Sequence, residues 1–381
     1  MLSSLEELRG LIAERRSDME TLRKLPDPVV EALIDLQLPR MYLPKAIGGL
    51  EIDPIEALQV IESLARADAA VAWVVWNNGL PCLFARYLGE EARREIFEPP
   101  AFFYASSTRP TGKAVVEPGG YKVSGRWSLV SGCLHADWLA FMCVEEKDGH
   151  MVMTPAETPQ LRLVFVPAAS CAIIDTWHAG GLRGSGSHDC VLEEVYVPAE
   201  KSFTPMDPMQ IDSRLGRVPI SSAMAAGHAA ICLGIAQSAL DTVIELGKTK
   251  VSVDGVPGLV DRASNQQIIA ETTTKIAAFR AHLMQKIAQL WAMAEEGPDR
   301  DPGVIGGVWR ASVTSSRECR NMVSDLYEVA GSPSLYEKCL LERCHRDIHA
   351  AMQHIISQKL WLEESGKVCF GLAPENPLFM L

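Results

Sequence analysis

A segment rich in glycine and serine, WHAGGLRGSGSHDC at residues 177–190, carries the strongest indication of a binding site in this sequence. Glycine lets the backbone approach a ligand closely, and its N–H groups and the serine hydroxyls can donate hydrogen bonds to an electron-rich ring or a phosphate. The spacing matches neither a Walker loop nor the complete G-x-G-x-x-G of a dinucleotide fold. A flexible hairpin loop is the alternative. The candidate contact residues are Arg183, Gly184, Ser185, Gly186 and Ser187.

A second segment, SGRWSLVSGCLHADW at residues 124–138, places an aromatic face and two hydroxyls on one short strand and its turn. An indole face can stack on a flat cofactor, and a hydroxyl can hydrogen-bond to a ring nitrogen. A strand with an ordinary core tryptophan is the alternative. The candidate residues are Trp127, Ser128, Ser131 and Gly132.

Three histidines follow one another in LLERCHRDIHAAMQHIISQ. On a helix, His345 and His349 share a face at i, i+4, whereas His354 is rotated away from them by more than about 100°. A catalytic zinc needs three protein ligands, so we expect no metal here. An isolated histidine on an alanine-rich helix usually has a structural role. Beside a flat redox cofactor, His354 would instead donate or accept a proton, because its ordinary pKa lies near neutrality.

The elements that must position these residues change in character twice along the chain. Helical periodicity dominates up to about residue 100, including one long apolar helix expected from Pro54 to Asn77. Short β-type runs follow, with a hairpin expected at Gly119 and Gly120, and helical patterns return from about Ile220. We therefore expect a mostly α chain with a central β domain, divided into helical residues 1–100, a β-barrel at 101–205 and helical residues 206–381.

Composition narrows the class of protein. The chain has 381 residues and a net charge of −12, which argues against a nucleic-acid or anionic-membrane surface. No apolar run approaches the roughly 20 residues that span a bilayer, and the N-terminal segment is helix-patterned rather than a signal peptide. Ten cysteines without any C-x-x-C favour a reducing cytoplasm.

Together with LPRMYLPKAIGGLE at residues 38–51, these segments resemble the acyl-CoA dehydrogenase fold over nearly the whole chain. More narrowly, they resemble its two-component, reduced-flavin-dependent monooxygenases. The resemblance implies an N-terminal helical domain, a central β-barrel and a C-terminal four-helix bundle in a homotetramer, with flavin between barrel and bundle. It implies that Trp127, Ser128, Ser131 and Gly132 line the isoalloxazine, with Ser131 near N5, and that residues 183–187 form a second flavin loop. It places His354 near flavin and substrate.

The activity implied by this resemblance is that of an oxygenase component. A separate NAD(P)H:flavin reductase would supply FMNH2, since the chain has no nicotinamide fingerprint. With O2, the enzyme would hydroxylate a phenolic, polycyclic or indole-like aromatic substrate through a C4a-hydroperoxyflavin. His354 and Ser131 are the expected catalytic residues. Asn77, Asn78 and His135 are further candidates for the substrate pocket.

Two alternatives stay open: an FAD-dependent acyl-CoA dehydrogenase or oxidase, and a catalytically silent binding scaffold of the same fold. A common dehydrogenase pattern places its catalytic glutamate eight residues before the arginine of a terminal R-D pair. Counting back from Arg346 gives Lys338, with Glu337 one residue off. The R-x-x-F-G segment that helps dehydrogenases hold the adenine half of FAD is absent, and KTKVSVDGVPGLVDR (248–262) occupies that region. We therefore expect FMN rather than FAD.

Overall fold

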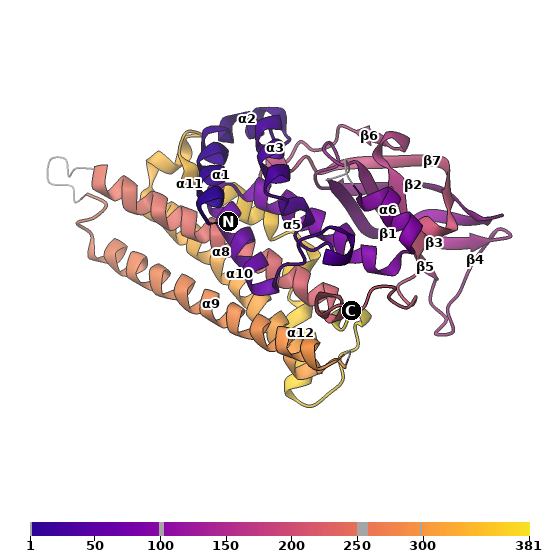
Figure 1. Ribbon diagram of the computed structural model, residues 1–381. Coiled ribbons are helices and arrows are strands. Elements are labelled where there is room, and N and C mark those ends of the chain that lie inside the picture. Colours follow the sequence, from indigo (N-terminus) through magenta and orange to yellow (C-terminus); the bar gives the residue numbers. More distant parts are fainter. Residues whose placement is uncertain (1, 99–102, 250–257, 298) are drawn as a thin grey trace.

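The computed structural model describes residues 2–98, 103–249, 258–297 and 299–381. Short helices at the N-terminus lie against a set of long helices, and one sheet lies at the right of the view, next to α5 (Figure 1). The N-terminal helices are α1 (Leu2–Glu14), α2 (Arg16–Leu22), α3 (Asp27–Asp35), α4 (Pro54–Ala67), α5 (Ala69–Phe84) and α6 (Glu90–Phe97). The later helices are α7 (Arg214–Arg217), α8 (Ile220–Thr249), α9 (Ala263–Glu296), α10 (Pro302–Ala330), α11 (Leu340–Ala351) and α12 (Leu360–Cys369).

The central sheet is mixed, because β1 and β3 run parallel while its other described pairs are antiparallel. Its order is β6-β7-β2-β1-β3-β5-β8, with β4 added beside β3, and β5 contacts β7 across the interior. In the described residues its end strands do not pair with each other, so the barrel is open. The strands are β1 (Tyr104–Glu117), β2 (Gly120–Val130), β3 (Trp138–Lys147), β4 (His150–Met151), β5 (Leu161–Pro167), β6 (Ala172–Ile174), β7 (His188–Pro198) and β8 (Ser202–Phe203).

The expected hairpin between β1 and β2 is confirmed. Glu117 pairs with Gly120, and the chain reverses through Gly119 at φ 79°, a conformation that glycine adopts without a steric penalty.

Strands β3 and β5 are buried on both faces over most of their length, which explains their nearly continuous apolar runs. Along β3, Leu139 and Phe141 point into the core enclosed by the sheet. The alternate residues Trp138 and Ala140 belong to the larger core shared with the helices. The sheet is therefore fixed against the helices along this strand, and so are the loops that leave its end.

The buried N-terminal helix expected from Pro54 to Asn77 is two helices. Asp68 separates α4 from α5 in an extended conformation, and its carboxylate accepts the N–H groups of Ala70 and Val71. Such an N-cap satisfies backbone donors that a helix start leaves free. The break turns α5, which is buried along nearly its whole length, toward the sheet and α8.

Helix α8 is the central helix of the C-terminal half and contacts α4, α5, α9, α10 and α11. Contrary to the expectation from the sequence, its segment Ile220–Lys248 is long and apolar enough to cross a membrane by length and composition. In the structure 67% of its apolar stretch is buried, so neighbouring protein elements cover most of this stretch. We propose that the three segments 1–100, 101–205 and 206–381 are the structural domains of the chain.

Candidate active site

Three segments far apart in the sequence meet around Trp73 on α5. Its indole N–H donates to the hydroxyl of Ser131, at the end of β2, with the two atoms 3.1 Å apart. The edge of the same ring lies against His354, with ring centroids 5.6 Å apart. Trp73 therefore connects the barrel motif to the C-terminal histidine.

A chain of buried serine hydroxyls extends from this contact into the glycine-rich loop. Ser131 Oγ lies 2.8 Å from Ser187 Oγ, which lies 2.7 Å from Ser185 Oγ. The N–H of Gly132 donates to the carbonyl of Ser185 at 2.9 Å. Because an indole N–H can only donate, the Ser131 hydroxyl accepts from Trp73. The structure thus brings together the two loops that the sequence singled out.

An aromatic cluster of two tryptophans and two histidines forms the other half of the junction. The Trp73 and Trp76 ring centroids are 4.9 Å apart, and Trp76 lies 5.3 Å from His354. His228 on α8 contacts all three rings at 5.9 to 6.0 Å. Trp76 is fully buried, and within the described residues its indole N–H has no hydrogen-bond partner. A buried donor without a partner is costly, and this edge of the ring packs closely on Gly227 of α8.

His354 does not lie on the helix that the sequence assigned to it. Helix α11 ends at Ala351, and His354 caps the short 3-10 turn η8 (Ile355–Ser357), where its Nδ1 accepts the N–H of Ile356 at 3.3 Å. Burial, followed by the nearby His228 and Arg109, lowers the pKa of His354 to about 3. The ring is therefore neutral near pH 7, with its proton on Nε2. In this structure it is a hydrogen-bond donor, and it does not titrate near neutrality as the sequence led us to expect.

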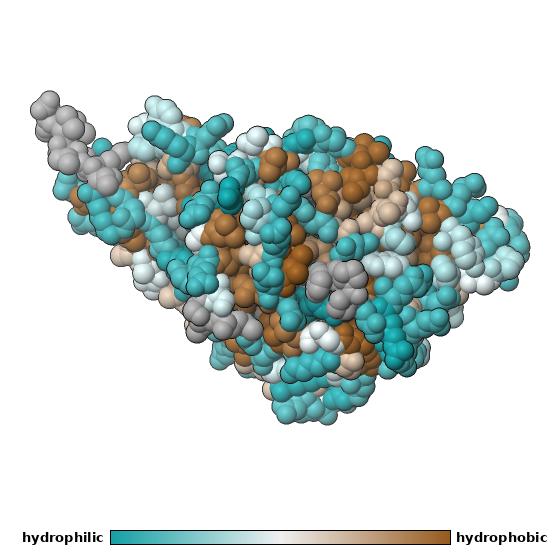
Figure 2. Space-filling model, turned by 45° about the horizontal axis from the view of Figure 1, so that its top comes forward, coloured by the Kyte–Doolittle hydropathy of each residue, from teal (hydrophilic) through white to brown (hydrophobic). Residues whose placement is uncertain are grey.

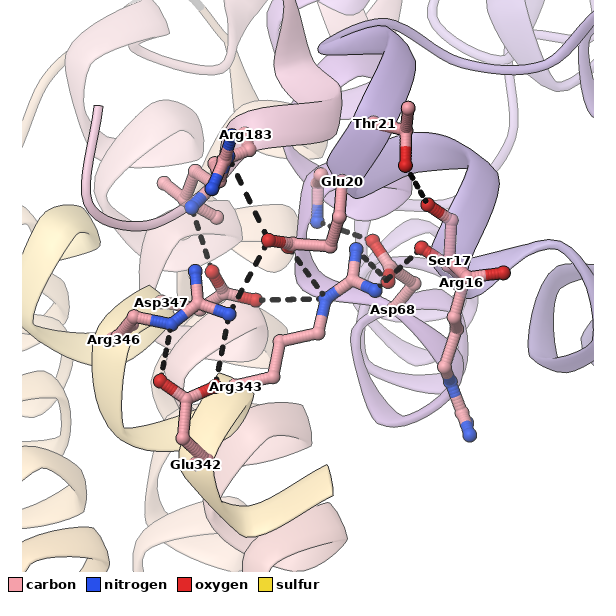
Figure 3. A network of polar contacts seen from close by, with 12 residues as sticks. Arg16, Ser17, Glu20, Thr21, Asp68, Arg183, Glu342, Arg343, Arg346 and Asp347 are labelled. Atoms are coloured by element: carbon pink, nitrogen blue, oxygen red, sulfur yellow. Dashed lines mark hydrogen bonds and ion pairs between the residues drawn. The ribbon is translucent and has the colours of Figure 1, made fainter. Parts of the chain in front are cut away.

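Helix α11 also holds the glycine-rich loop in place through its Arg-Asp pair. The Asp347 carboxylate accepts the N–H of Leu182 at 2.6 Å, and Arg346 donates to the carbonyl of Gly180 at 2.7 Å. Figure 3 shows these two side chains in a larger network in which Arg343 also takes part. Burial raises the pKa of Asp347 to about 7, although Arg343 opposes this shift.

Arg183 and Gly184 of the predicted flavin loop contact the N-terminal helices. Arg183 points toward Glu20 of α2, with Nε 3.7 Å from the carboxylate, and it joins the charged network of Figure 3. A Cβ on Gly184 would stand 2.9 Å from Cβ of Met19 and 3.2 Å from Cβ of Ala70, so this glycine permits close packing on α2 and α5. Gly186 adopts φ 53° at the end of the 3-10 turn η5 (Arg183–Ser185).

Three predicted site residues make their contacts within the protein, away from the junction around Trp73. Trp127 is fully buried in the barrel core, stacks on Phe141 at 4.3 Å and donates to the carbonyl of Met142, so no face is left for a cofactor. The buried amide of Asn78 donates to the carbonyl of Pro39 and accepts the N–H of Tyr104.

His135 Nε2 accepts the backbone N–H of Leu25 at 3.2 Å, and burial lowers the pKa of this histidine to about 4. Asn77 and Ser128 stay partly exposed and remain candidates. Asn77 lies one turn after Trp73 and donates to its carbonyl.

Sequence reasoning missed Trp73, Trp76 and His228, because they lie in helices so apolar that they read simply as core. Two local features of the sequence could have indicated these residues. Trp73 and Trp76 share a helix face at i, i+3, and His228 is a polar side chain in the otherwise apolar run AMAAGHAAICLG.

The structure does not favour the dehydrogenase alternative. Glu337 and Lys338 are both exposed in the connection before α11, and neither joins the junction around Trp73. Within the described ranges no group of three metal-ligating side chains was found. The segment 248–262, which lacks the adenine-binding motif, lies largely outside the described residues.

The junction suits a flat heteroaromatic ring with acceptors at its edge. Two N–H donors, Nε1 of Trp76 and Nε2 of His354, have no hydrogen-bond partner within the described part of the chain. Exposed aliphatic side chains stand beside the polar residues in the sequence: Leu129 and Leu134 near Ser131, and Ile355 next to His354. Donors bordered by apolar surface are what a flavin ring would need.

Comparisons with known proteins identify families and structures to which the chain is similar. The model of the acyl-CoA dehydrogenase N-terminal domain matches residues 6–101, and that of the C-terminal domain matches residues 226–359. Indole-3-acetate monooxygenase of Pseudomonas putida is 28% identical over 94% of this chain and 91% of its own. The flavin-dependent monooxygenase oxygenase subunit HsaA of Mycobacterium tuberculosis is 27% identical over 97% and 94%. The structure of XiaF from Streptomyces sp., in complex with FADH2 and glycerol, has a TM-score of 0.89 at 26% identity and covers 98% of this chain and 96% of its own.

Proposed function

The chain belongs to the acyl-CoA dehydrogenase family and is a flavin-dependent monooxygenase, and on this premise we propose that the junction around Trp73 is its oxygenation site. The observation that carries the proposal is the position of Trp73 between the serine hydroxyls and His354. On one side it donates to the serine hydroxyl chain, and on the other it packs against the neutral ring of His354. No other place in the described structure joins all three segments that the sequence singled out.

We propose that Ser131, Ser185, Ser187 and the backbone of Gly132 hold the flavin from the barrel side, with His354 and Trp76 on the helical side. Ser128 is a further candidate on the barrel side. Bound there, the reduced flavin supplies the two electrons with which O2 places one oxygen atom in the substrate and releases the other as water.

The residues of the chain have three tasks in this reaction. The buried tryptophans exclude water from the ring, which limits loss of reducing equivalents as hydrogen peroxide. The hydroxyl of Ser131 is held at a fixed position by Trp73 and Ser187. The Nε2–H of His354 can stabilise negative charge on the flavin or on a phenolic oxygen without first changing its protonation state.

The substrate class we propose is a small aromatic molecule that carries a negative charge. Arg109, in the irregular segment of β1 between Ser107 and Gly112, is exposed and close enough to His354 to lower its pKa. Within the described residues this arginine has no ion-pair partner. A carboxylate on the substrate would supply one, and Asn77 could add a hydrogen bond.

The other partners follow from the same proposal. A separate NAD(P)H:flavin reductase would deliver the reduced flavin, for which we propose FMNH2, although the similar XiaF structure holds FADH2. We propose a homotetramer, in support of which Figure 2 shows apolar side chains gathered in patches on one face of the chain. All ten cysteines are free thiols, which supports a cytoplasmic location.

Oxygenation under 18O2 tests the proposed function. The protein, FMNH2 and indole-3-acetate are mixed with 18O2, and the product is analysed by mass spectrometry. One 18O atom per product molecule is expected, with an Arg109→Gln variant raising KM about tenfold or more for this carboxylate and much less for indole. Oxidation of FMNH2 to give only hydrogen peroxide with indole-3-acetate and a panel of phenolic acids would contradict the proposal.

A further inference from the structure

We propose that His228, buried in the middle of α8, is the positioning residue for His354 and thereby sets the coupling of flavin oxidation to oxygenation. This inference rests on the proposed function above. Both ring nitrogens have hydrogen-bond partners on other helices, and Nδ1 also lies 3.8 Å from Cys232 Sγ on α8 itself. Nδ1 lies 3.1 Å from Ser316 Oγ on α10, and Nε2 lies 2.9 Å from the carbonyl oxygen of Ala351, the last residue of α11.

The protonation of His228 is fixed by these partners. Burial lowers its pKa to about 4, so the ring is neutral near pH 7 and carries a single N–H. The carbonyl of Ala351 can only accept, and the proton therefore sits on Nε2. Nδ1 is then an acceptor, and the Ser316 hydroxyl at 3.1 Å is the nearer of its two possible donors, the Cys232 thiol at 3.8 Å being the other.

The link to His354 runs through the same carbonyl. Ala351 O also accepts the backbone N–H of His354 at 3.1 Å, so His228 holds the turn from which His354 projects. The two imidazole rings also lie 5.9 Å apart at 30° to one another. Without the hydrogen bond from His228 to Ala351, the end of α11 would become more mobile. The Nε2–H of His354 would then lose its fixed direction toward the flavin.

A pair of isosteric variants separates the hydrogen bond to Ala351 from simple space filling. The amide nitrogen of glutamine reaches the place of Nε2, whereas that of asparagine reaches only the place of Nδ1. We expect His228→Gln to keep kcat within about threefold of the unmodified protein. We expect His228→Asn to lower kcat about tenfold or more with KM for indole-3-acetate nearly unchanged, and to divert reducing equivalents to hydrogen peroxide.

Two serine variants on α10 provide a change that is milder than replacing His228, together with its control. Ser316→Ala removes the nearer partner of Nδ1, while Ser315→Ala removes a neighbouring buried hydroxyl that has no hydrogen-bond partner in the described structure. Histidine ring nitrogens, labelled with 15N, report tautomer and environment by NMR without any turnover. The His354 signals, assigned by their loss in His354→Gln, should shift in Ser316→Ala and stay in place in Ser315→Ala.

The outcomes distinguish this inference from the proposed function. If the unmodified protein oxygenates and His228→Asn keeps its kcat and coupling, the inference is wrong and the function stands. Equal shifts of the His354 signals in both serine variants, or an Nδ1–H tautomer for His228, would also overturn it. If the unmodified protein gives no oxygenated product, the proposed function fails, and the NMR comparison still decides whether His228 positions His354. Should His228→Asn not fold, Ser316→Ala carries the kinetic test.

Discussion

At the scale of single residues, the neutral state of His354 decides what this side chain can do. The sequence predicted a histidine in this region but not its protonation, because the pKa depends on burial and on neighbours from α5 and α8 that no local pattern reveals. With a pKa of about 3 and Nδ1 already occupied by Ile356 N–H, the ring offers a fixed donor. A general base needs a free lone pair on a group that titrates near the working pH.

This difference predicts how two His354 variants behave. His354→Gln keeps an N–H near the position of Nε2 and should retain product formation within about tenfold, whereas His354→Ala should lose about a hundredfold or more. Steady-state kcat/KM with indole-3-acetate measures both. For the same reason, His354 should add no limb to the pH–rate profile between pH 5 and 8. If His354→Gln is as inactive as His354→Ala, the histidine is an acid–base catalyst after all.

Ser131 carries the second prediction at this scale. Ser131→Ala removes the acceptor of the buried Trp73 N–H and the start of the hydroxyl chain. We expect more hydrogen peroxide per FMNH2 oxidised, a free energy of unfolding lower by about 1–3 kcal/mol, and FMNH2 affinity within a few-fold of the unmodified protein. Peroxide yield and urea denaturation provide the measurements. Ser170→Ala, at an exposed serine outside the chain of hydroxyls, is the control, and equal peroxide yields from the two variants would exclude Ser131 from the mechanism.

At the scale of elements, the site depends on where helices end and how closely they pack. Periodicity predicted helices in the correct regions, but it joined α4 to α5 across Asp68 and extended α11 beyond Ala351 to His354. Both errors have one cause. Capping at Asp68 depends on the direction in which the chain must turn to reach its partners, and the turn after Ala351 is held by His228, which is 123 residues distant in sequence. The sequence of the segment alone carries neither piece of information.

Helix packing at the site leads to a prediction about two glycines. Gly227 on α8 faces Trp76, and an added Cβ would stand 2.5 Å from Cδ1 and 2.6 Å from Nε1 of that ring. Gly366 on α12 has no atom within 4 Å of the same position. We therefore expect Gly366→Ala to raise the free energy of unfolding by up to about 1 kcal/mol. Gly227→Ala should lower it by about 1–3 kcal/mol and weaken FMNH2 binding, because Trp76 must move. Equal stabilisation of the protein by both changes would contradict the packing described here.

At the scale of the whole molecule, the buried His228 and the partly buried His135 and His354 make stability depend on pH. The folded pKa values of His135, His228 and His354 lie at about 3 to 4, below the ordinary value of about 6.5. Above pH 6.5 both states are neutral at these rings. As the pH falls from 6.5 toward 4, the unfolded chain binds protons that the folded chain does not, and stability is lost. Asp347 acts in the opposite direction, because its raised pKa makes the folded chain hold a proton that the unfolded chain has released.

The contribution of His228 can be isolated by comparison with His228→Gln. Between pH 6.5 and 4.5 the advantage of the unmodified protein over this variant should shrink by up to about 2.7 kcal/mol, which is two pH units at about 1.36 kcal/mol each. Urea denaturation at the two pH values measures the difference. His150→Gln, which changes an exposed histidine, is the control and should show no such trend. If the difference in free energy of unfolding between the unmodified protein and His228→Gln stays constant with pH, His228 is not buried in the neutral form.

The overall architecture was the most predictable part of the molecule, because the change from helical to β-type patterns and back is recorded in long stretches of sequence. The site was only partly predictable. Ser131 and the serines of the glycine-rich loop could be found from their motifs, whereas Trp127, which looked equally suitable, stacks on Phe141 inside the barrel. Strand alternation decides which of two neighbouring side chains points inward, and a shift of one residue reverses the assignment.

The claim that the Trp73 junction holds a reduced flavin is tested most directly by anaerobic equilibrium dialysis of the protein against FMNH2 and, separately, FADH2. No substrate or oxygen is needed, so the result does not depend on knowing what the enzyme hydroxylates. We predict saturable binding of one reduced flavin per chain, weakened about tenfold or more in His354→Ala and unchanged in His349→Ala, whose side chain hydrogen-bonds within α11. Absence of binding by either flavin, or equal weakening in the two histidine variants, would contradict the assignment of the site.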